Sequence, residues 1–284
     1  MINLYDYDKL GRLKNVQEKE IASTGEDLVK DTSYSYDSSH NISTKTNNLL
    51  GNPEDNYEKY TYSDNGTNLS YYGEHIDGVL NQATQRVYTK DLNGNITKDQ
   101  KIGKFFEYDV EDRLVHVEGQ GITGTLKYNY DSEGLLTQIR RSPTDITRFV
   151  WEDGKIVLEF NQNNEWQKKH RWGTDGLIST DTRNLSNNSI DREYFINDTH
   201  GNVVQKLNEN RGIIKTYMYD EFGVEQDIDP NDTNPFRYCG EYYDKNTDML
   251  YLRDRFYDAD IGRFIQRDSF EGKENEALTL NRYT

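Results

Sequence analysis

The most reactive side chains in this sequence are a single cysteine and five histidines. Cys239 could act as a nucleophile only if a neighbouring base or positive charge favoured its thiolate. Its context is Arg237-Tyr238-Cys239-Gly240-Glu241, with no histidine close to it in the sequence. One cysteine also excludes an internal disulfide, a four-cysteine zinc site and a Cys-x-x-Cys redox pair. We therefore predict that Cys239 is a packed cysteine in a strand.

The histidines form no metal-binding or hydrolase motif. They are His40, His75, His116, His170 and His200. None belongs to a His-Glu-x-x-His motif or lies beside a Gly-x-Ser-x-Gly motif, and the chain has no Gly-x-x-x-x-Gly-Lys phosphate loop. His200 precedes Gly201 and Asn202 in an expected turn, where we predict a structural role. The sequence thus predicts no metal and no cofactor.

A short tyrosine–aspartate unit recurs along the chain, and its carboxylates could in principle bind calcium or sugar. It begins at Tyr5-Asp6-Tyr7-Asp8, at Tyr128-Asn129-Tyr130-Asp131 and at Tyr217-Met218-Tyr219-Asp220. Calcium loops of the form Asp-x-Asp-x-Asp-Gly are absent. In Tyr-x-Tyr-Asp the two rings share one face of a strand, and the Asp can accept backbone N–H groups in an Asx-turn. We therefore predict a structural hairpin unit rather than a repeated binding site.

The turn residues between the aromatic runs indicate hairpins. The clearest signal is Asn93-Gly94, where we expect both residues to accept a positive φ. In the run from Phe106 to Val115, Asp112 replaces the usual glycine. Weaker versions begin at Tyr34, Tyr60, Phe149, His170 and Tyr194. The segments 47–56, 183–191 and 227–234 are predicted to be loops, the last an acidic joint before a denser segment.

The spacing of the units selects the repeat architecture. The steps Phe106 to Tyr128, Tyr128 to Phe149 and Phe149 to His170 are 22, 21 and 21 residues. This period suits one hairpin plus a connection, and it is shorter than a propeller blade of about 40–50 residues. We predict an all-β fold of about nine to ten degenerate hairpins, stacked into a spiral, shell-like extended sheet.

The composition agrees with a sheet rich in tyrosine and limits the partners. Only 33% of residues are apolar, but 22 tyrosines, 10 phenylalanines and 3 tryptophans can supply a core. The net charge of −16 argues against binding nucleic acid or anionic lipid, both of which need a basic surface. The sequence shows no apolar run long enough for a membrane helix and no signal peptide. The chain begins and stops within repeat-like sequence, so we expect a piece of something longer.

Residues 234–270 differ from the repeats. They include Asn234-Pro235-Phe236 to Asp244, Met249-Leu250-Tyr251 to Asp258, and Ile261-Gly262-Arg263 to Phe270. This segment resembles the RHS repeat-associated core, the C-terminal signature of the RHS/YD-repeat family, and the upstream units resemble YD repeats. The departures are Ala259, where proline is usual, and Asp248, where glycine is frequent. The resemblance covers essentially the whole chain, with YD/RHS repeats at 1–226 and the core segment at 234–284.

The resemblance implies a hollow shell of hairpins that encloses a C-terminal toxin or effector of the same polypeptide. In toxin members the core segment also cleaves itself by aspartyl chemistry, in which two carboxylates act as acid and base. That role would fall on Arg267 and Asp268, with Glu276 as the second acid. A structural Arg267–Asp268 pair closing a turn is the alternative. The chain ends at Leu280-Asn281-Arg282-Tyr283-Thr284, before the expected cleavage motif.

Three functions follow from these patterns. The first is a structural shell module that encapsulates and helps to deliver an effector, without turnover of its own in this fragment. The second is single-turnover aspartyl self-cleavage in the full-length protein, and the third is an extracellular carbohydrate- or partner-binding adhesion module. The family resemblance implies a secreted or cell-surface bacterial protein. An exposed sheet edge predicts self-association.

Overall fold

The computed structural model describes residues 2–22, 25–49, 56–63, 68–271 and 281–283 of the chain. The chain forms two compact units, the first of residues 1–103 with 267–284 and the second of residues 104–266. Strand pairing is antiparallel across the described residues, and their helical content is two 3₁₀ turns, η2 (Tyr238–Gly240) and η3 (Ala259–Ile261). The prediction of an all-β hairpin fold is therefore confirmed.

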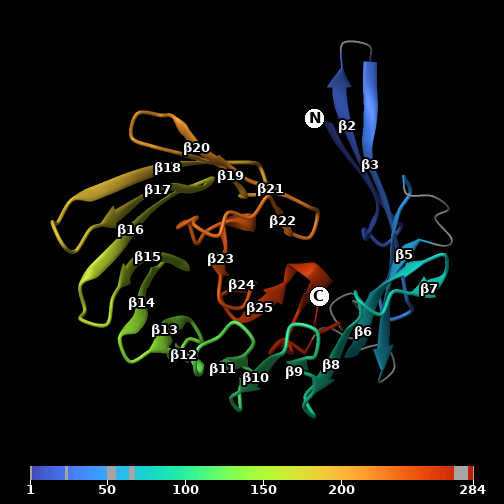
Figure 1. Ribbon diagram of the computed structural model, residues 1–284, viewed down its shortest axis with the longest axis horizontal. Coiled ribbons are helices and arrows are strands. Elements are labelled where there is room, and N and C mark those ends of the chain that lie inside the picture. The colour runs from blue at the N-terminus through green and yellow to red at the C-terminus, as the bar shows by residue number, and fades with distance from the viewer. Residues whose placement is uncertain (1, 23–24, 50–55, 64–67, 272–280, 284) are drawn as a thin grey trace. The chain divides into compact units, whose positions relative to one another are not determined.

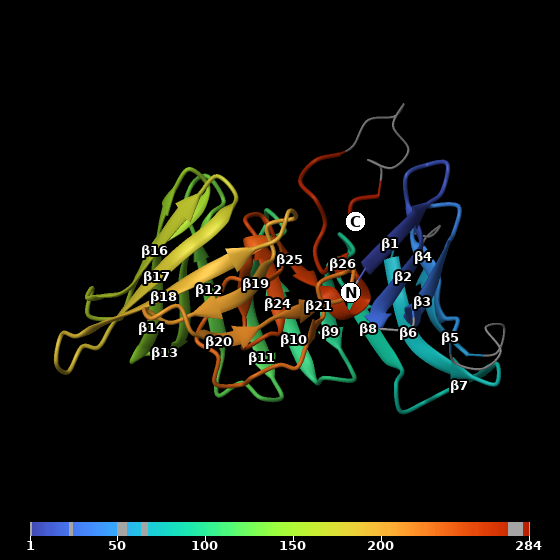
Figure 2. The ribbon, with the colours of Figure 1, turned by 90° about the horizontal axis from the view of Figure 1, so that it is seen from above.

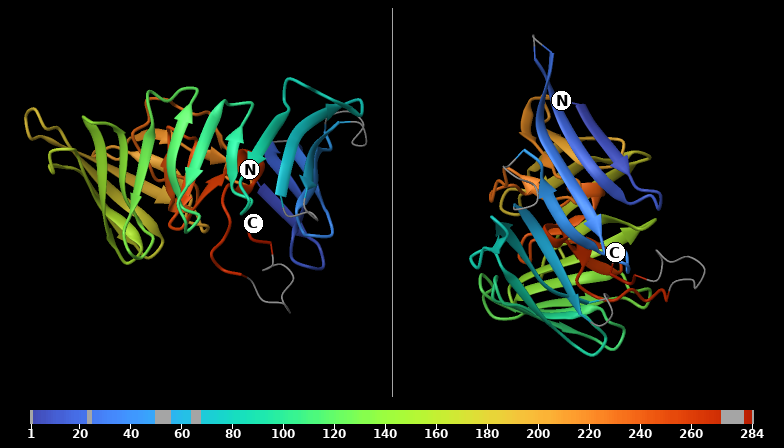
Figure 3. Two further views of the ribbon diagram at one scale, coloured as in Figure 1. Left: turned by 90° about the horizontal axis from the view of Figure 1, so that it is seen from below. Right: turned by 90° about the vertical axis from the view of Figure 1, so that its right-hand side faces the viewer.

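In the first unit the strands pair mainly in chain order. β1 to β6 pair consecutively, β7 pairs with the end of β6, and β6 and β9 flank β8. The blue strands near the N-terminus run side by side in the right-hand view of Figure 3. The strands are β1 (Ile2–Tyr7), β2 (Leu13–Ala22), β3 (Gly25–Tyr36), β4 (Ile42–Asn47), β5 (Tyr57–Ser63), β6 (Asn68–Ile76), β7 (Val79–Leu80), β8 (Arg86–Lys90) and β9 (Ile96–Asp99).

The second unit has a longer sheet and a C-terminal segment that lies against it. In Figures 1 and 2 this sheet, β10–β20, curves around the elements β21–β26. The sheet strands are β10 (Lys104–Tyr108), β11 (Leu114–Gly119), β12 (Leu126–Tyr130), β13 (Leu136–Ser142), β14 (Asp145–Glu152), β15 (Lys155–Phe160), β16 (Trp166–Gly173), β17 (Gly176–Arg183), β18 (Ile190–Asn197), β19 (Val203–Leu207) and β20 (Ile213–Thr216). The segment contains β21 (Met218–Tyr219), β22 (Glu225–Gln226), β23 (Tyr242–Asp244), β24 (Met249–Leu252), β25 (Arg255–Asp258) and β26 (Arg263–Phe264).

In most units the aspartate, or an asparagine in its place, shapes the turn through the Asx contacts that the sequence predicted. Asp131 Oδ1 accepts the N–H groups of Glu133 and Leu135, both at 2.9 Å. The Asp131 N–H in turn donates to the Leu135 carbonyl at 3.0 Å. The same pair of contacts, to the second and fourth residue on, recurs at Asp8, Asp37, Asp91, Asp109, Asp198 and Asp220 and, with an amide oxygen, at Asn161 and Asn208.

A shift of the pairing register recurs at one place in the unit, just before its second ring or the residue that takes the place of that ring. In β12 the shift falls between Asn129 and Tyr130. Equivalent shifts precede Tyr7, Tyr36, Tyr62, Tyr108, Trp151, Trp172 and Asn197. A bulge of this kind bends a strand and increases its twist. The bend is therefore a property of the repeat and not of one hairpin.

In six units of the described chain the second ring, and in a seventh Asn197 in its place, donates a hydrogen bond to the preceding hairpin. Tyr130 donates its hydroxyl to the Leu114 carbonyl at 2.5 Å, and Trp151 Nε1 donates to the Leu136 carbonyl at 2.7 Å. The carbonyl belongs to the first strand residue after the preceding turn. Comparable contacts join Tyr36 to Leu13, Tyr62 to Ile42, Trp172 to Ile156, Asn197 to Leu177 and Tyr219 to Val203. This series of contacts, here called the ring ladder, links consecutive repeats.

Three sequence expectations need correction. At Asn93-Gly94 only the glycine has a positive φ, of 90°. The Asp91 carboxylate binds the Asn93 and Asn95 N–H groups and so sets a longer turn than the expected two-residue loop. In the unit at Tyr194 the buried ring is Phe195, 8% exposed, whereas Tyr194 is 36% exposed. The third correction concerns Cys239 and is described with the site.

Candidate functional site

The C-terminal segment covers the second-unit sheet through aromatic contacts. The Phe256 ring lies edge-on to Tyr128 at 5.1 Å between centroids, and Tyr242 lies edge-on to Phe149 at 5.2 Å. Tyr251 contacts Tyr130 and Trp151, and Phe236 contacts His170 and Trp172, whereas the contact of Tyr238 with Tyr219 lies within the segment itself. The three successive repeats that contain β12, β14 and β16 therefore present rings to the segment. The ring partners of these sheet residues lie in the segment.

Polar contacts fix the position of the segment across the same surface. The buried Tyr128 hydroxyl donates to Asp244 Oδ2 at 2.5 Å, and burial together with the Asp244 charge raises the pKa of Tyr128 well above its usual value. The Lys104 ammonium donates to the Asn246 carbonyl at 3.0 Å. The Leu136 N–H donates to the Tyr251 hydroxyl at 2.9 Å. Directional bonds of this kind define one register where ring contacts alone would tolerate sliding.

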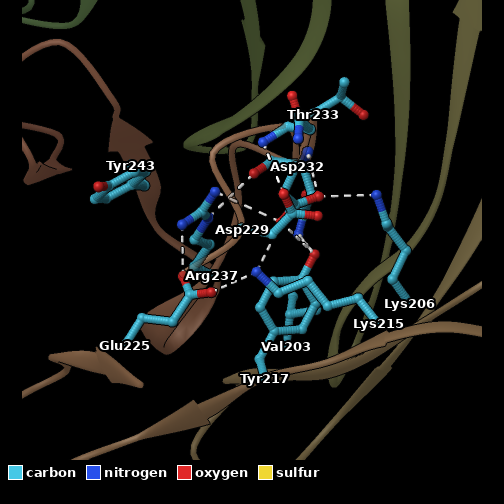
Figure 4. A network of polar contacts seen from close by, with 12 residues as sticks. Val203, Lys206, Lys215, Tyr217, Glu225, Asp229, Asp232, Thr233, Arg237 and Tyr243 are labelled. Carbon is cyan, nitrogen blue, oxygen red and sulfur yellow. Dashed lines mark hydrogen bonds and ion pairs between the residues drawn. The ribbon is translucent and has the colours of Figure 1, made fainter. Parts of the chain in front are cut away.

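A buried charge cluster connects the last repeats to the start of the segment, as shown in Figure 4. Asp232, 6% exposed, lies 2.8 Å from Lys206 Nζ and accepts the Tyr217 hydroxyl at 2.8 Å. Arg237 pairs with Glu225 at 2.5 Å, and Lys215 pairs with the same Glu225 at 2.6 Å. The acidic joint predicted at 227–234 thus contains the central anion of the cluster.

The cluster holds its groups in charged form. Burial alone would raise the pKa of Asp232, but the hydrogen bonds from Lys206 and Tyr217 outweigh it and lower that pKa. Burial opposes the charge of Lys206 as well, yet the bonds to Asp232 and Glu193 raise the Lys206 pKa. Removing one member would leave its partners charged and desolvated, which is costly. The joint at 227–234 therefore anchors the C-terminal segment to the last repeats of the sheet.

A second buried pair lies beneath Phe236. His170 Nε2 is 3.0 Å from Glu159 Oε1, and its Nδ1 is 2.9 Å from the Thr180 hydroxyl. Burial lowers the pKa of His170 despite the neighbouring Glu159. For Glu159, burial is opposed by Lys168 and His170, and the net effect lowers its pKa. A neutral His170 can donate from Nε2 to an ionised Glu159 while its Nδ1 accepts the Thr180 hydroxyl, so both ring nitrogens have a partner.

The prediction of a packed strand cysteine is wrong. Cys239 is exposed in η2, with φ 52°, and lines a groove of about 900 Å³ together with His200, Trp172 and Asp198. Partial burial and the Glu241 charge raise the pKa of the Cys239 thiol. A raised pKa lowers the thiolate fraction and so opposes nucleophilic chemistry. The sequence analysis did not place His200 near Cys239, because the turn that carries His200 lies far from Cys239 in the chain.

The predicted catalytic residues Arg267 and Asp268 lie in the first unit on a short segment with defined backbone contacts. The Arg267 N–H donates to Asn95 Oδ1 at 2.8 Å, and the Asp268 N–H donates to the Arg282 carbonyl at 2.9 Å. Asp268 Oδ1 accepts the Phe270 N–H at 2.8 Å. Glu276 lies outside the described residues. The proposed carboxylate pair therefore remains a prediction.

The sequence analysis missed Tyr283 and Asn281, two residues that bind the C-terminal end of the chain to turns of the first unit. Tyr283 donates its hydroxyl to the Asn93 carbonyl at 2.7 Å, and its ring lies where a side chain on Gly94 would be. The Asn281 amide donates to Asn41 Oδ1 at 2.7 Å. The sequence signal that could have revealed these contacts was the asparagine four positions after the Asp in some of the hairpin turns. Within the described residues, no three His, Cys, Asp or Glu side chains form a group suited to a metal ion.

Comparison with models of known protein families assigns this chain to a class of proteins. The family model for the Teneurin YD-shell matches residues 5–284, and the chain belongs to that family. The match confirms the resemblance drawn from the tyrosine–aspartate units and residues 234–270. No helix in the described part of the chain is long and apolar enough to cross a bilayer.

Particular relatives share this sequence. The chain is 27% identical over 216 residues to the tRNA3(Ser)-specific nuclease WapA of Bacillus spizizenii, covering 72% of this chain and 9% of that protein. It is 23% identical over 303 residues to the double-stranded DNA deaminase toxin A of Burkholderia cenocepacia, covering 93% of this chain and 20% of that protein. The chain thus spans a small part of these relatives.

A solved structure shows the same fold. The TcdB2-TccC3-Cdc42 structure matches with a TM-score of 0.54 at 14% identity, covering 99% of this chain and 17% of that chain. At this identity the likeness concerns the fold alone. Together with the family match and the toxin relatives, it supports a YD-shell module of the kind found in toxins.

Proposed function

We propose that this chain is a wall segment of a shell that encloses a C-terminal effector of the same polypeptide. The observation that carries the proposal is the curved β10–β20 sheet, whose repeats present rings to one continuous C-terminal segment. The toxin relatives support a secreted or surface-exposed bacterial protein with an effector as its partner.

Limited proteolysis of the full-length polypeptide tests this function. The region after the core segment should resist protease while the repeats remain folded, and it should become sensitive at the urea concentration that unfolds them. The same region expressed alone is the control. Equal digestion rates for the enclosed and the free region would disprove encapsulation.

We further propose that Arg267 and Asp268 contribute to a single self-cleavage in the full-length protein, with Glu276 as the second acid. The defined backbone contacts of Arg267 and Asp268 favour it, because a reacting carboxylate has to be held in place. Intact mass of a chain extended through the cleavage motif tests the role. Asp268→Asn should remain uncut while wild type and the matched control Asp254→Asn are cut. Equal cutting of all three would eliminate Asp268.

Self-association is proposed from the first unit. Within the described residues β1 pairs only with β2, and its Leu4, Tyr5 and Tyr7 side chains are exposed. An unpaired apolar edge promotes pairing between chains. Light scattering should show oligomers, and a monodisperse monomer would contradict the proposal. The adhesion alternative stays a prediction that a glycan array can test.

A further inference from the structure

The fifth residue of the hairpin turn, four positions after the Asp, differs in kind between repeats. Three turns place asparagine there, at Asn41, Asn95 and Asn202. Asn41 and Asn95 are fully buried. Each of the three donates its side-chain amide to the aspartate of its own turn, to Asp37 at 3.0 Å, Asp91 at 2.9 Å and Asp198 at 2.8 Å. The amide group is thereby oriented, with its oxygen directed away from the turn.

In all three turns that oxygen accepts a hydrogen from the C-terminal part of the chain. Asn202 Oδ1 accepts the Cys239 N–H at 2.7 Å in the second unit. In the first unit Asn95 Oδ1 accepts the Arg267 N–H at 2.8 Å, and Asn41 Oδ1 accepts the Asn281 side-chain amide at 2.7 Å. Two of these donors are backbone N–H groups, which need a partner when they leave water.

Arginine at the same position forms a different contact. Arg113 Nε donates to Asp109 Oδ2 at 2.8 Å, and the guanidinium lies over the Tyr130 ring of the next repeat, 5.2 Å from its centroid. Arg12 repeats this arrangement with Asp8 and the Tyr36 ring at 4.4 Å. A guanidinium has only donors and cannot accept an N–H group. Asn and Arg therefore direct the turn toward different neighbours.

We propose that Asn41, Asn95 and Asn202 are docking residues, each of which fixes one stretch of the C-terminal part of the chain on a repeat of its own unit. Each turn with asparagine at this position is a receptor for one amide N–H donor, whereas an arginine turn binds the adjacent repeat. Asn95 is then a positioning residue for Arg267 and Asp268. The docking role does not depend on the proposed enclosure of an effector or on self-cleavage.

Amide hydrogen exchange on the folded chain tests the docking role. In Asn95→Ala the Arg267 amide should exchange about tenfold faster, corresponding to about 1.4 kcal/mol for one lost hydrogen bond to a buried acceptor. The Asn93 amide, which donates to the Asp91 carboxylate, should keep its protection. Asn202→Ala should have the same effect on the Cys239 amide and leave the Arg267 amide unchanged.

Arg113→Ala is the matched control, since it removes the side chain from the same turn position. It should leave the Arg267 and Cys239 amides at wild-type rates. Asn95→Ser, which keeps a hydroxyl for Asp91, serves if Asn95→Ala does not fold. An unchanged Arg267 amide in the folded Asn95 variant would overturn the inference, as would uniform loss of protection across the sheet. Because exchange is measured without an effector, failure of encapsulation gives a different result from failure of docking.

Discussion

The same Tyr-x-Tyr-Asp unit is exposed at one place in the molecule and buried at another. Tyr5 and Tyr7 of β1 are 45% and 56% exposed, whereas Tyr128 of β12 is 3% exposed and Tyr130 is half-buried. Tyr128 and Tyr130 have the C-terminal segment over them and a preceding hairpin beside them. The difference shows that the unit supplies the rings, while its neighbours determine how much those rings stabilise.

The largest expected effect comes from removing one ring at each place. Tyr128→Ala should lower the free energy of unfolding by about 3–5 kcal/mol, because a buried aromatic side chain is lost. Tyr5→Ala, the control, should change it by less than about 0.5 kcal/mol. Urea unfolding followed by circular dichroism measures both. Similar losses in the two variants would refute the comparison.

Removing a charge gives the next largest contrast. Asp232→Asn should cost about 3 kcal/mol, since Lys206 and Arg237 then lose a charged partner in a buried setting. Asp6→Asn, in an exposed pair with Lys14 at 3.5 Å, should have no measurable effect. Thermal unfolding of the two variants is the readout. A stable Asp232→Asn protein would show that the cluster does not anchor the segment.

Acid should weaken the second unit in two stages. The His170 pKa is lowered on folding, so its contribution is complete above the ordinary value of 6.5 and is lost as pH falls below it. Glu159 and Asp232 also have lowered pKa values, so their contributions disappear below about 4.5 and 3.8 respectively. All three tryptophans lie in this unit, so tryptophan fluorescence during urea titration reports it. His170→Gln should abolish the upper stage, and an unaltered pH profile would contradict this assignment.

The smallest effect tests the ring ladder. Tyr130→Phe should cost about 1 kcal/mol, because the Leu114 carbonyl loses its 2.5 Å hydrogen bond while the ring remains. Tyr7→Phe should be neutral, since Tyr7 is 56% exposed and its hydroxyl has no such acceptor among the described residues. Paired urea titrations resolve a difference of this size if both proteins keep the same denaturant slope. Equal stabilities would remove the hydroxyl from the ladder.

Local sequence was sufficient to predict the repeats, because their determinants lie within a few residues. Asp131 contacts residues two and four positions away, and Asp112 takes the positive φ predicted where it replaces glycine. The family resemblance came from contiguous motifs and was equally accessible. What was local in the fold was therefore predictable from the sequence.

The site contacts were not predictable in this way, since they join residues far apart in the chain. Arg267 meets Asn95 across 172 positions, and Cys239 meets Asn202 across 37. The burial of Asp232 depends on Lys206, Tyr217 and Arg237 meeting at one point, so an acidic composition alone suggested only a joint. Long-range packing likewise decided the exposure of Cys239.

The recurring bulge has a consequence for how such a chain can change in length. Side chains alternate between the faces of a strand, so losing one residue from a strand would turn its rings to the opposite face. Removing a complete hairpin takes away one ring, one bulge and one turn together, and it brings matching strands into contact. The sheet is therefore expected to tolerate insertions and deletions in whole hairpins and to resist them in single residues.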